Sequence, residues 1–382
     1  MSNSFDQIIS RKNTQSIRWD KYPADVIPLW VADMDFICPQ FILDGLQKRL
    51  QHGILGYTYA SETFKQKIVD YIDRQYGCLI EKEWITFLPS VVSGLHLAAQ
   101  HLLGSSDHAL VPSPAYHHFY DSVNQAGKQF SEFHMTLKDG RWVFSIDELE
   151  ALVKPNTRLL MLCNPHNPGG TVFRKEELIE LSDFCLKHQI ILCTDEIHAD
   201  LILDEGLRHT PLVGLNHLIT ENSFSLMSLN KVFNFPGIGL AWMVTKNVEI
   251  RRKMTAQIHA SVPEPNLFAY LATELAMTPD SPSSDWYKEL IIYLRHNRDL
   301  VEERIKTIPQ LSMAHLESTY LAWIDASQLQ LTDPQEYFLK AGVALSPGTQ
   351  FRAPQFLRLN FGVPKTILSQ ALDRIEKACQ LI

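Results

Sequence analysis

The chain is poor in the features that mark several classes of protein. It has 17 Gly and 20 Pro among 382 residues, too few for a low-complexity or collagen-like chain. No run approaches the ~18 apolar residues of a membrane helix, and residues 1–15 lack the apolar stretch of a secretory signal. The six cysteines form no CxxC pair and no zinc-finger spacing. We therefore expect reduced thiols and a cytoplasmic protein without a membrane segment.

An excess of positive charge is also missing. Lys and Arg number 35 and Asp and Glu number 43, which gives a formal net charge of −8. A chain of this charge has no general attraction for nucleic acid or for an anionic membrane surface, so we expect neither partner. Its hydrophobic fraction of 45% and aromatic fraction of 10% are typical of a protein with a large packed core. The length predicts about two domains.

Short apolar runs alternate with helical patterns through the middle of the chain. Helices are predicted over 39–51, 61–76 and 175–188, and strands over 85–88, 109–111, 159–163, 190–194, 224–227 and 240–244. Several of these strands are continuously apolar, as strands buried on both faces of a parallel sheet are. The alternation of strand and helix predicts a layered α/β domain.

The pattern changes after residue 282. A stretch containing Ser and Pro, 278–285, precedes a helical pattern, and the elements beyond it form a different series. They are a helix over 286–307, strands over 320–324 and 356–361, and a last helix over 364–381. We predict a large domain over 47–282. We also predict a smaller α+β domain built from both chain ends, 1–46 and 283–382.

Several common site motifs are absent. The chain has no P-loop, no HExxH and no GxSxG motif. Gly237 and Gly239 are followed by Trp242 where a dinucleotide-binding fingerprint needs a small residue. His117 and His118 have no cysteine or carboxylate partner at zinc-ligand spacing. We expect a surface or structural role for these histidines and no metal site.

Polar residues follow four of the apolar runs. The segments are LCNPHNPGG (162–170), CTDEIHADL (193–201), SLMSLNKVFNFPG (225–237) and FLRLNFG (356–362). Because sites in α/β proteins lie at the carboxyl ends of the strands, we expect side chains from these segments to meet. Taken singly, most have structural explanations: Asn and Pro end strands, Asp and Glu cap helices, and a strand Arg can extend to solvent.

Lys231 is less easily explained as structural. Its amine lies between Met227 and the pair Val232 and Phe233, where burial costs free energy unless the charge is paired or used. An amine kept neutral in such surroundings is suited to Schiff-base chemistry with a carbonyl group.

The four segments resemble a known family when they are taken together with LWVADMDF (29–36), GYTYA (56–60), PSVVSGL (89–95) and SPAYHHF (113–119). The chain resembles the class I/II aminotransferase superfamily of pyridoxal-phosphate enzymes. Its motifs look closest to those of the cystathionine β-lyase, or C–S lyase, branch. The resemblance extends from about Trp30 to the C-terminus. It implies an aspartate aminotransferase-like fold, in which a large three-layer α/β/α domain with a mostly parallel sheet accompanies a smaller α+β domain.

The resemblance assigns the groups around the cofactor ring. Lys231 would bind pyridoxal phosphate covalently and, once released, remove the Cα proton of the substrate. Asp195 would pair with the pyridine nitrogen, and Asn167 would donate to the ring oxygen. His198 would lie near that same oxygen, although a capping or core role for this histidine stays open. Tyr116 would stack on the ring, as aromatic surfaces favour.

The resemblance also assigns the phosphate and carboxylate contacts. The amides of Val91 and Val92, at the positive end of a helix, and the hydroxyl of Ser228 would hold the phosphate. Tyr57 would reach the phosphate from the neighbouring subunit, which implies a homodimer with shared active sites. Arg358 would bind the substrate α-carboxylate through its planar fork.

The implied activity is cleavage of an L-cysteine S-conjugate such as cystathionine to a thiol, pyruvate and ammonia. An aminotransferase on the same fold is the main alternative, and a non-catalytic cofactor-binding protein is a second. Transaminases of the superfamily carry a phosphate-binding arginine eight residues after the lysine. Here that position is Gly239, which favours the lyase branch. Asn230 also replaces the serine that usually precedes the lysine.

Overall fold

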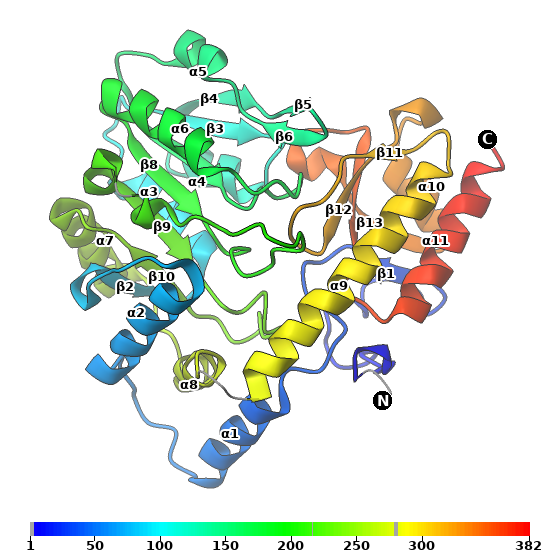
Figure 1. Cartoon of the computed structure of the whole chain (residues 1–382), viewed down its shortest axis with the longest axis horizontal. Helices are drawn as coiled ribbons and strands as arrows, with labels where there is room; N and C mark the ends of the chain where they lie inside the picture. Colours follow the sequence, from blue (N-terminus) through cyan, green and yellow to red (C-terminus); the bar gives the residue numbers. More distant parts are fainter. Residues whose placement is uncertain (1–3, 216, 279–281) are drawn as a thin grey trace.

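Two β-sheets organise the molecule (Figure 1). The structure, a computed structural model, describes residues 4–215, 217–278 and 282–382. A seven-stranded sheet has the strand order β2-β10-β9-β8-β7-β3-β4, and a five-stranded sheet has the order β1-β13-β14-β12-β11. A hairpin of β5 (Thr136–Lys138) and β6 (Arg141–Val143) forms a third, two-stranded sheet.

The seven-stranded sheet contains all six predicted strands of the middle region. Its strands are β2 (Ile85–Leu88), β3 (His108–Ser113), β4 (Gln129–His134), β7 (Thr157–Cys163), β8 (Ile191–Asp195), β9 (Ser223–Met227) and β10 (Ala241–Val244). Neighbouring strands are parallel except where β10 pairs with β2 and β9. The missed strand, β4, lies at the sheet edge and is largely exposed or half-buried. It therefore lacks the continuous apolar run of a central strand.

Helices cover both faces of this sheet, which confirms the predicted three-layer α/β/α arrangement. One face packs against α3 (Val91–His101), α4 (His118–Gln125) and α7 (Val248–Ser261), and the other against α5 (Ile146–Leu152) and α6 (Lys175–Lys187). Along β7, Leu159 belongs to the first core and Leu160 to the second. Neighbouring residues of a strand point to opposite faces, so burial of both faces produces the continuous apolar runs.

Helix ends follow the capping signals in the sequence. α2 (Glu62–Tyr76) begins after Ser61, whose hydroxyl accepts a hydrogen bond from the Phe64 amide at 3.1 Å, and ends before Gly77 at φ +65°. α1 (Gln40–Gln51) follows Pro39 as predicted and contacts α8 (Leu267–Ala276). Short 3₁₀ helices occupy Ser4–Asp6, Lys82–Trp84, Leu212–Gly214, Leu218–Asn222, Ser327–Leu329 and Gly348–Phe351.

The five-stranded sheet joins the two ends of the chain. β1 (Ile27–Leu29) runs parallel to β13 (Val343–Pro347), and β14 (Phe356–Asn360) lies between β13 and β12 (Leu321–Asp325), with β11 (Ser312–Met313) at the edge. α9 (Pro282–Lys306) and α11 (Lys365–Cys379) pack on this sheet, and α10 (Pro334–Lys340) precedes β13. The N-terminal residues thus join a smaller α+β unit, whose strands β1, β11 and β13 were not predicted.

The predicted domain boundaries at 46/47 and 282/283 stay predictions. Residues 279–281 of the stretch containing Ser and Pro lie outside the described residues, and α9 begins at Pro282, four residues before its predicted start at residue 286. Within the parts of the chain that the structure describes, every helix is too short or too polar to cross a membrane.

Glu317 connects the two main parts of the fold. It lies shortly before β12 and is 4% exposed. Its carboxylate accepts hydrogen bonds from Arg141 Nε at 3.0 Å and from the Val172 amide at 2.8 Å, and it also pairs with Arg174. Both arginines belong to the part of the chain that precedes α6, so this buried carboxylate fixes β12 and its neighbour β14 against the larger unit.

We predict that Glu317→Gln lowers the free energy of unfolding by about 3 kcal/mol, because loss of one charge leaves two guanidinium groups without their buried partner. Urea denaturation followed by far-ultraviolet circular dichroism measures this change. Glu336→Gln is the matched control, since Glu336 is exposed and its pair with Lys340 spans 3.5 Å. A loss from Glu317→Gln no larger than the loss from Glu336→Gln would contradict the role given to Glu317.

Candidate active site

A cavity of about 410 Å³ lies where the carboxyl ends of β7 and β8 face β14. Of the ten predicted site residues, it brings together Val91, Val92, Tyr116, Asn167, Asp195, His198, Lys231 and Arg358. Its wall also includes side chains and backbone that the sequence did not single out, namely Ile17, Trp30, Val31, Ala32, Ser90, His117, Ile197, Asn230, Pro236, Ser346 and Gln350. Both sheets therefore contribute to one site.

Lys231 projects its amine into this cavity. Nζ donates a hydrogen bond to the carbonyl oxygen of Ala32 at 2.7 Å. Burial lowers the pKa of the amine to about 8, while the negative charge of Asp33 opposes this shift, Arg358 adds to it, and Asp195 opposes it. An amine with a pKa near neutrality can serve as a nucleophile and as a base, as the sequence predicted from its apolar surroundings.

Asp195 ends β8 and faces the same cavity. Its Oδ1 accepts a hydrogen bond from the Ile197 amide at 3.0 Å. Burial raises the pKa of this carboxyl to about 7, and the neighbouring Glu196 adds to the shift, whereas the Ile197 amide and Lys231 oppose it. A carboxylate that is costly to ionise alone is suited to binding a protonated ring nitrogen, which would stabilise its charge.

Glu196 has a structural role. Its carboxylate is fully buried against His209 Nε2 at 2.9 Å and accepts hydrogen bonds from Thr194 and Ser225 hydroxyls and from the Leu212 amide. The adjacent acids thus point to opposite sides of the strand end. Of the two, only Asp195 lines the cavity.

His198 presents an unpaired nitrogen to the site. Burial, together with the positive charges of Lys231 and Arg358, lowers the pKa of its imidazole to about 3. The ring is therefore neutral. Its Nδ1 is buried without a hydrogen-bond partner among the described residues, and the same holds for Asn230 Oδ1 and Arg358 Nε. Buried polar atoms rarely remain unpaired, so these groups fit a polar ligand in the cavity.

Arg358 is held in one orientation by groups from three segments. Nη1 donates to Asn167 Oδ1 at 3.1 Å, and Nη2 donates to the Trp30 carbonyl at 3.3 Å and to Ser346 Oγ at 3.4 Å. The guanidinium carbon lies 4.7 Å from the centre of the Phe351 ring. Burial lowers the pKa of this arginine to about 10. A fixed, buried and uncompensated guanidinium favours a carboxylate ligand.

The start of α3 also lines the cavity, through Ser90, Val91 and Val92. Ser90 caps the helix by accepting a hydrogen bond from the Ser93 amide at 3.0 Å, and the amides of Val91 and Val92 belong to the turn that has no intrahelical acceptors. Such an end binds anions. A Cβ at Gly239 would lie 2.6 Å from the Pro89 carbonyl oxygen. Position 239 thus packs directly against the backbone that leads into this helix, and any side chain there would displace it.

Two predicted residues do not line the cavity. The Ser228 hydroxyl donates to the Leu240 carbonyl at 2.6 Å, so it joins the end of β9 to the residue before β10, and its predicted phosphate contact is untested. Tyr57 is fully exposed and borders a separate groove of about 820 Å³ between residues 55–58 and 263–268. Within one chain it is remote from the cavity wall.

The expectation that His117 and His118 have no nearby carboxylate is wrong. Asp121 lies one helical turn after them in α4, and ligand atoms of these three residues lie within 4.8 Å of one another. Asp121 follows His118 by three residues and His117 by four, a spacing that differs from that of zinc fingers and that brings side chains together on a helix. Whether the chain binds a metal stays untested.

The fold and this arrangement of residues place the chain in a known family. It belongs to the class I and II aminotransferases: the profile of the family, described as Aminotransferase class I and II, matches residues 24–375. The resemblance inferred from the sequence is thereby confirmed, as is the expected fold class.

Individual relatives are similar over nearly the whole chain. Cystathionine beta-lyase PatB of Bacillus subtilis is 34% identical, and the match covers 98% of this chain and 99% of PatB. The crystal structure of OvoB superposes with a TM-score of 0.95 at 37% identity, covering 98% of each chain. Cystalysin from Treponema denticola, whose structure contains pyridoxal 5'-phosphate, gives 0.94 at 29% identity over 100% of this chain and 99% of that chain. Aspartate aminotransferases are more distant, at 22% and 24% identity.

Asp195 should make the stability of the cofactor-free chain depend on pH. Its folded pKa of about 7 lies above the ordinary value of 3.8, so the folded chain binds the proton more tightly than the unfolded chain. The stability gained from this proton is fully present below pH ~3.8 and is lost as the pH rises through about 7.

Asp195→Asn removes this titration. We predict that, from about pH 5 to about pH 8, the free energy of unfolding of this variant rises by about 2 kcal/mol relative to that of the parent. Urea unfolding of both cofactor-free proteins at the two pH values measures the change. Asp139→Asn, in the exposed turn between β5 and β6, is the control and should follow the parent at both. Parallel stability curves for Asp195→Asn and the parent would rule out the raised pKa.

Proposed function

We propose that the protein is a pyridoxal-phosphate-dependent C–S β-lyase, which cleaves L-cystathionine or a related L-cysteine S-conjugate to a thiol, pyruvate and ammonia. The observation that carries the proposal is the convergence of Lys231, Asp195 and Arg358 on one cavity. Similar proteins support it, since PatB is named a cystathionine beta-lyase and aspartate aminotransferases are less similar.

The cavity fits the cofactor in charge and hydrogen-bonding capacity. Lys231 would hold it covalently, and the carboxylate of Asp195 would face its ring nitrogen. The unpaired Nδ1 of His198 and the amide of Asn167, whose oxygen already accepts from Arg358, would serve its ring oxygen. Tyr116 would cover one ring face. The phosphate would lie at the N-terminus of α3, against the amides of Val91 and Val92.

Three of the residues that line the cavity would each have a separate role in the reaction. When bound, pyridoxal phosphate supplies an electron sink for negative charge developing at the substrate Cα. Lys231 removes the Cα proton as general base. Asp195 holds a proton on the ring nitrogen through its negative charge. Arg358 binds the α-carboxylate and so determines which bond at Cα is presented to Lys231. The sulfur would then leave Cβ as a thiolate, which becomes the thiol on taking up a proton, and addition of water to the remaining three-carbon fragment gives pyruvate and ammonia.

The cavity wall favours a lyase over a dicarboxylate transaminase. Among the described residues that line it, the cationic side chains are Lys231 and Arg358, and both have roles at the reacting end of the substrate. The rest of the wall offers Ile17, Trp30 and Pro236 as apolar surface. An acidic substrate side chain would find no second guanidinium there, whereas a thioether would find apolar contacts.

A homodimer with shared sites is part of the proposal. The segment between α1 and α2 exposes Ile54, Leu55, Tyr57 and Tyr59 to solvent. A cluster of large apolar side chains on one loop is typical of a surface that a partner covers. A second copy covering this loop would place its site beside Tyr57. We also propose a cytoplasmic location, which the six free cysteines favour.

We predict that the protein releases pyruvate from L-cystathionine without added keto acid. Lys231→Ala should lower this rate roughly 10³-fold, because the general base is lost, and should abolish the visible absorption of bound cofactor. Pyruvate is measured with a coupled dehydrogenase assay, and thiol release is followed in parallel. Lys246→Ala, which removes an exposed lysine paired with Glu221, is the control. Amino-group transfer to a keto acid with no pyruvate from L-cystathionine alone would reject the lyase.

Mixing two inactive or weakened variants tests the shared sites. Tyr57→Phe should weaken cofactor binding about 10-fold by removing one phosphate contact, and Lys231→Ala should be inactive. In a mixed dimer, one site carries both substitutions and the other carries neither. Subunits mixed under exchange conditions should therefore gain activity over either variant alone. Activity equal to the average of the two separate variants, or a monomer by light scattering, would exclude sharing.

A further inference from the structure

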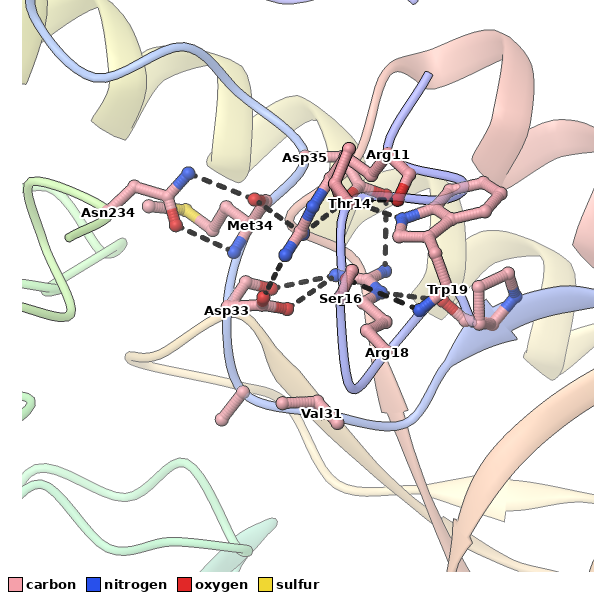
Figure 2. Close-up of polar contacts among 12 residues, drawn as sticks. Arg11, Thr14, Ser16, Arg18, Trp19, Val31, Asp33, Met34, Asp35 and Asn234 are labelled. Atoms are coloured by element: carbon pink, nitrogen blue, oxygen red, sulfur yellow. Dashed lines mark hydrogen bonds and ion pairs between the residues drawn. The ribbon is translucent and has the colours of Figure 1, made fainter. Parts of the chain in front are cut away.

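The segment 30–36, WVADMDF, is bound by charged groups that the proposed reaction does not use. Figure 2 shows Asp33 and Asp35 from this segment beside Arg11 and Arg18 from the N-terminal region, with Asn234 on the other side. Asn234 accepts from the Met34 amide at 2.9 Å and donates to the Met34 and Phe36 carbonyls at 2.9 and 2.7 Å. The segment is therefore fixed from two sides, and Asn234 lies only three residues after Lys231.

The two acids and two arginines form one buried cluster. Arg11 donates to Asp33 Oδ2 at 2.5 Å and to Asp35 Oδ1 at 2.8 Å. Arg18, which is fully buried, lies 3.4 Å from Asp33 Oδ1 and 3.6 Å from Asp35 Oδ2. Trp19 Nε1 also donates to Asp35 at 2.9 Å. Asp33 thus faces two guanidinium groups, of which only Arg11 is partly exposed.

Asp33 is joined by one peptide bond to the group that holds the Lys231 amine. The Ala32 carbonyl accepts hydrogen bonds from Lys231 Nζ at 2.7 Å and from the Tyr320 hydroxyl at 3.0 Å. On the other side of this peptide, the Asp33 carbonyl accepts from Arg18 at 2.7 Å and from Asn360 at 2.6 Å. These contacts leave the Ala32 carbonyl little freedom to turn away from the amine.

We propose that Asp33 is a positioning residue for Lys231: it holds the Ala32 carbonyl against the amine and, with its charge partly offset by Arg11, sets the electrostatic environment of the amine. This inference rests on the proposed function only in giving the amine a catalytic task. The contacts themselves belong to the chain without cofactor. Arg11 then acts on Lys231 through Asp33, although it touches neither substrate nor cofactor.

The charges that face Lys231 predict the direction in which the pKa of its amine should move in each variant. Asp33 and Asp195 attract a proton to the amine, whereas Arg358 repels it; His198 is neutral, and the Tyr320 hydroxyl shares the Ala32 carbonyl. Loss of the Asp33 charge should make the amine release its proton at lower pH. Loss of Arg11 should have the opposite effect, because Asp33 then keeps more of its negative charge unpaired. A purely structural cluster would not produce opposite shifts.

Trace acetylation of Lys231 measures the protonation of its amine. The full chain, freed of cofactor, is labelled with acetic anhydride over a range of pH, and the Lys231 peptide is quantified by mass spectrometry. We expect the labelling midpoint to fall by about 1 pH unit in Asp33→Asn and to rise by about half a unit in Arg11→Gln. In the holoenzyme, the pH midpoint of the visible absorption of bound cofactor should move in the same two directions.

Lys12→Gln is the matched control, since Lys12 is an exposed neighbour whose amine binds the Ala24 carbonyl. It should leave the midpoint unchanged. Shifts in the same direction for Asp33→Asn and Arg11→Gln, or no shift beyond that of Lys12→Gln, overturn the proposal. If Asp33→Asn fails to fold, Arg11→Gln decides: a rise supports the proposal and an unchanged midpoint overturns it. Because labelling requires neither cofactor nor lyase activity, failure of the proposed function leaves this result readable.

Discussion

The burial of the Lys231 amine is the constraint on which the site depends. A buried ammonium group is costly, and burial is the main cause that lowers the pKa of the amine to about 8. The fold limits this cost with one backbone acceptor, the Ala32 carbonyl, and with carboxylates on two sides, Asp33 and Asp195. Ala32 and Asp33 belong to the N-terminal segment after β1, Asp195 ends β8, and Lys231 follows β9. The position of the lysine therefore requires that the N-terminal segment, β8 and the segment after β9 come together.

The same requirement explains why both chain ends enter one sheet. Arg358 lies on β14, and its guanidinium contacts Trp30 from the N-terminal segment and Ser346 from β13. β1 pairs with β13 and ends at residue 29. The segment that follows β1 contains Ala32, whose carbonyl accepts the hydrogen bond from the Lys231 amine. Glu317 then fixes this unit to the larger one through buried contacts with Arg141 and Arg174. The Arg358 guanidinium and the Lys231 amine are thus held at a set separation by elements far apart in sequence.

The sequence predicted the parts of the fold whose signals are local. The central strands were found because burial on both faces makes them continuously apolar, and α2 was found because Ser61 and Gly77 mark its ends. β4 was missed because it is a polar edge strand. The residues facing the cavity were assigned by resemblance, while the Arg11–Asp33 pair was missed since 22 residues separate its partners. No spacing rule relates two residues whose contact is created by the tertiary fold.

Gly239 shows how packing can restrict the chemistry of a family member. A transaminase-type arginine at this position would need a Cβ where the Pro89 carbonyl stands 2.6 Å away. The backbone before α3 would have to move, and with it the amides of Val91 and Val92. Under the proposed function, the phosphate would therefore be held by the helix end itself and, in the proposed dimer, by Tyr57. The glycine consequently does more than omit a side chain: it lets the segment after Lys231 pack against the turn that begins α3, so under the proposed function the position of the amine would be coupled to that of the phosphate.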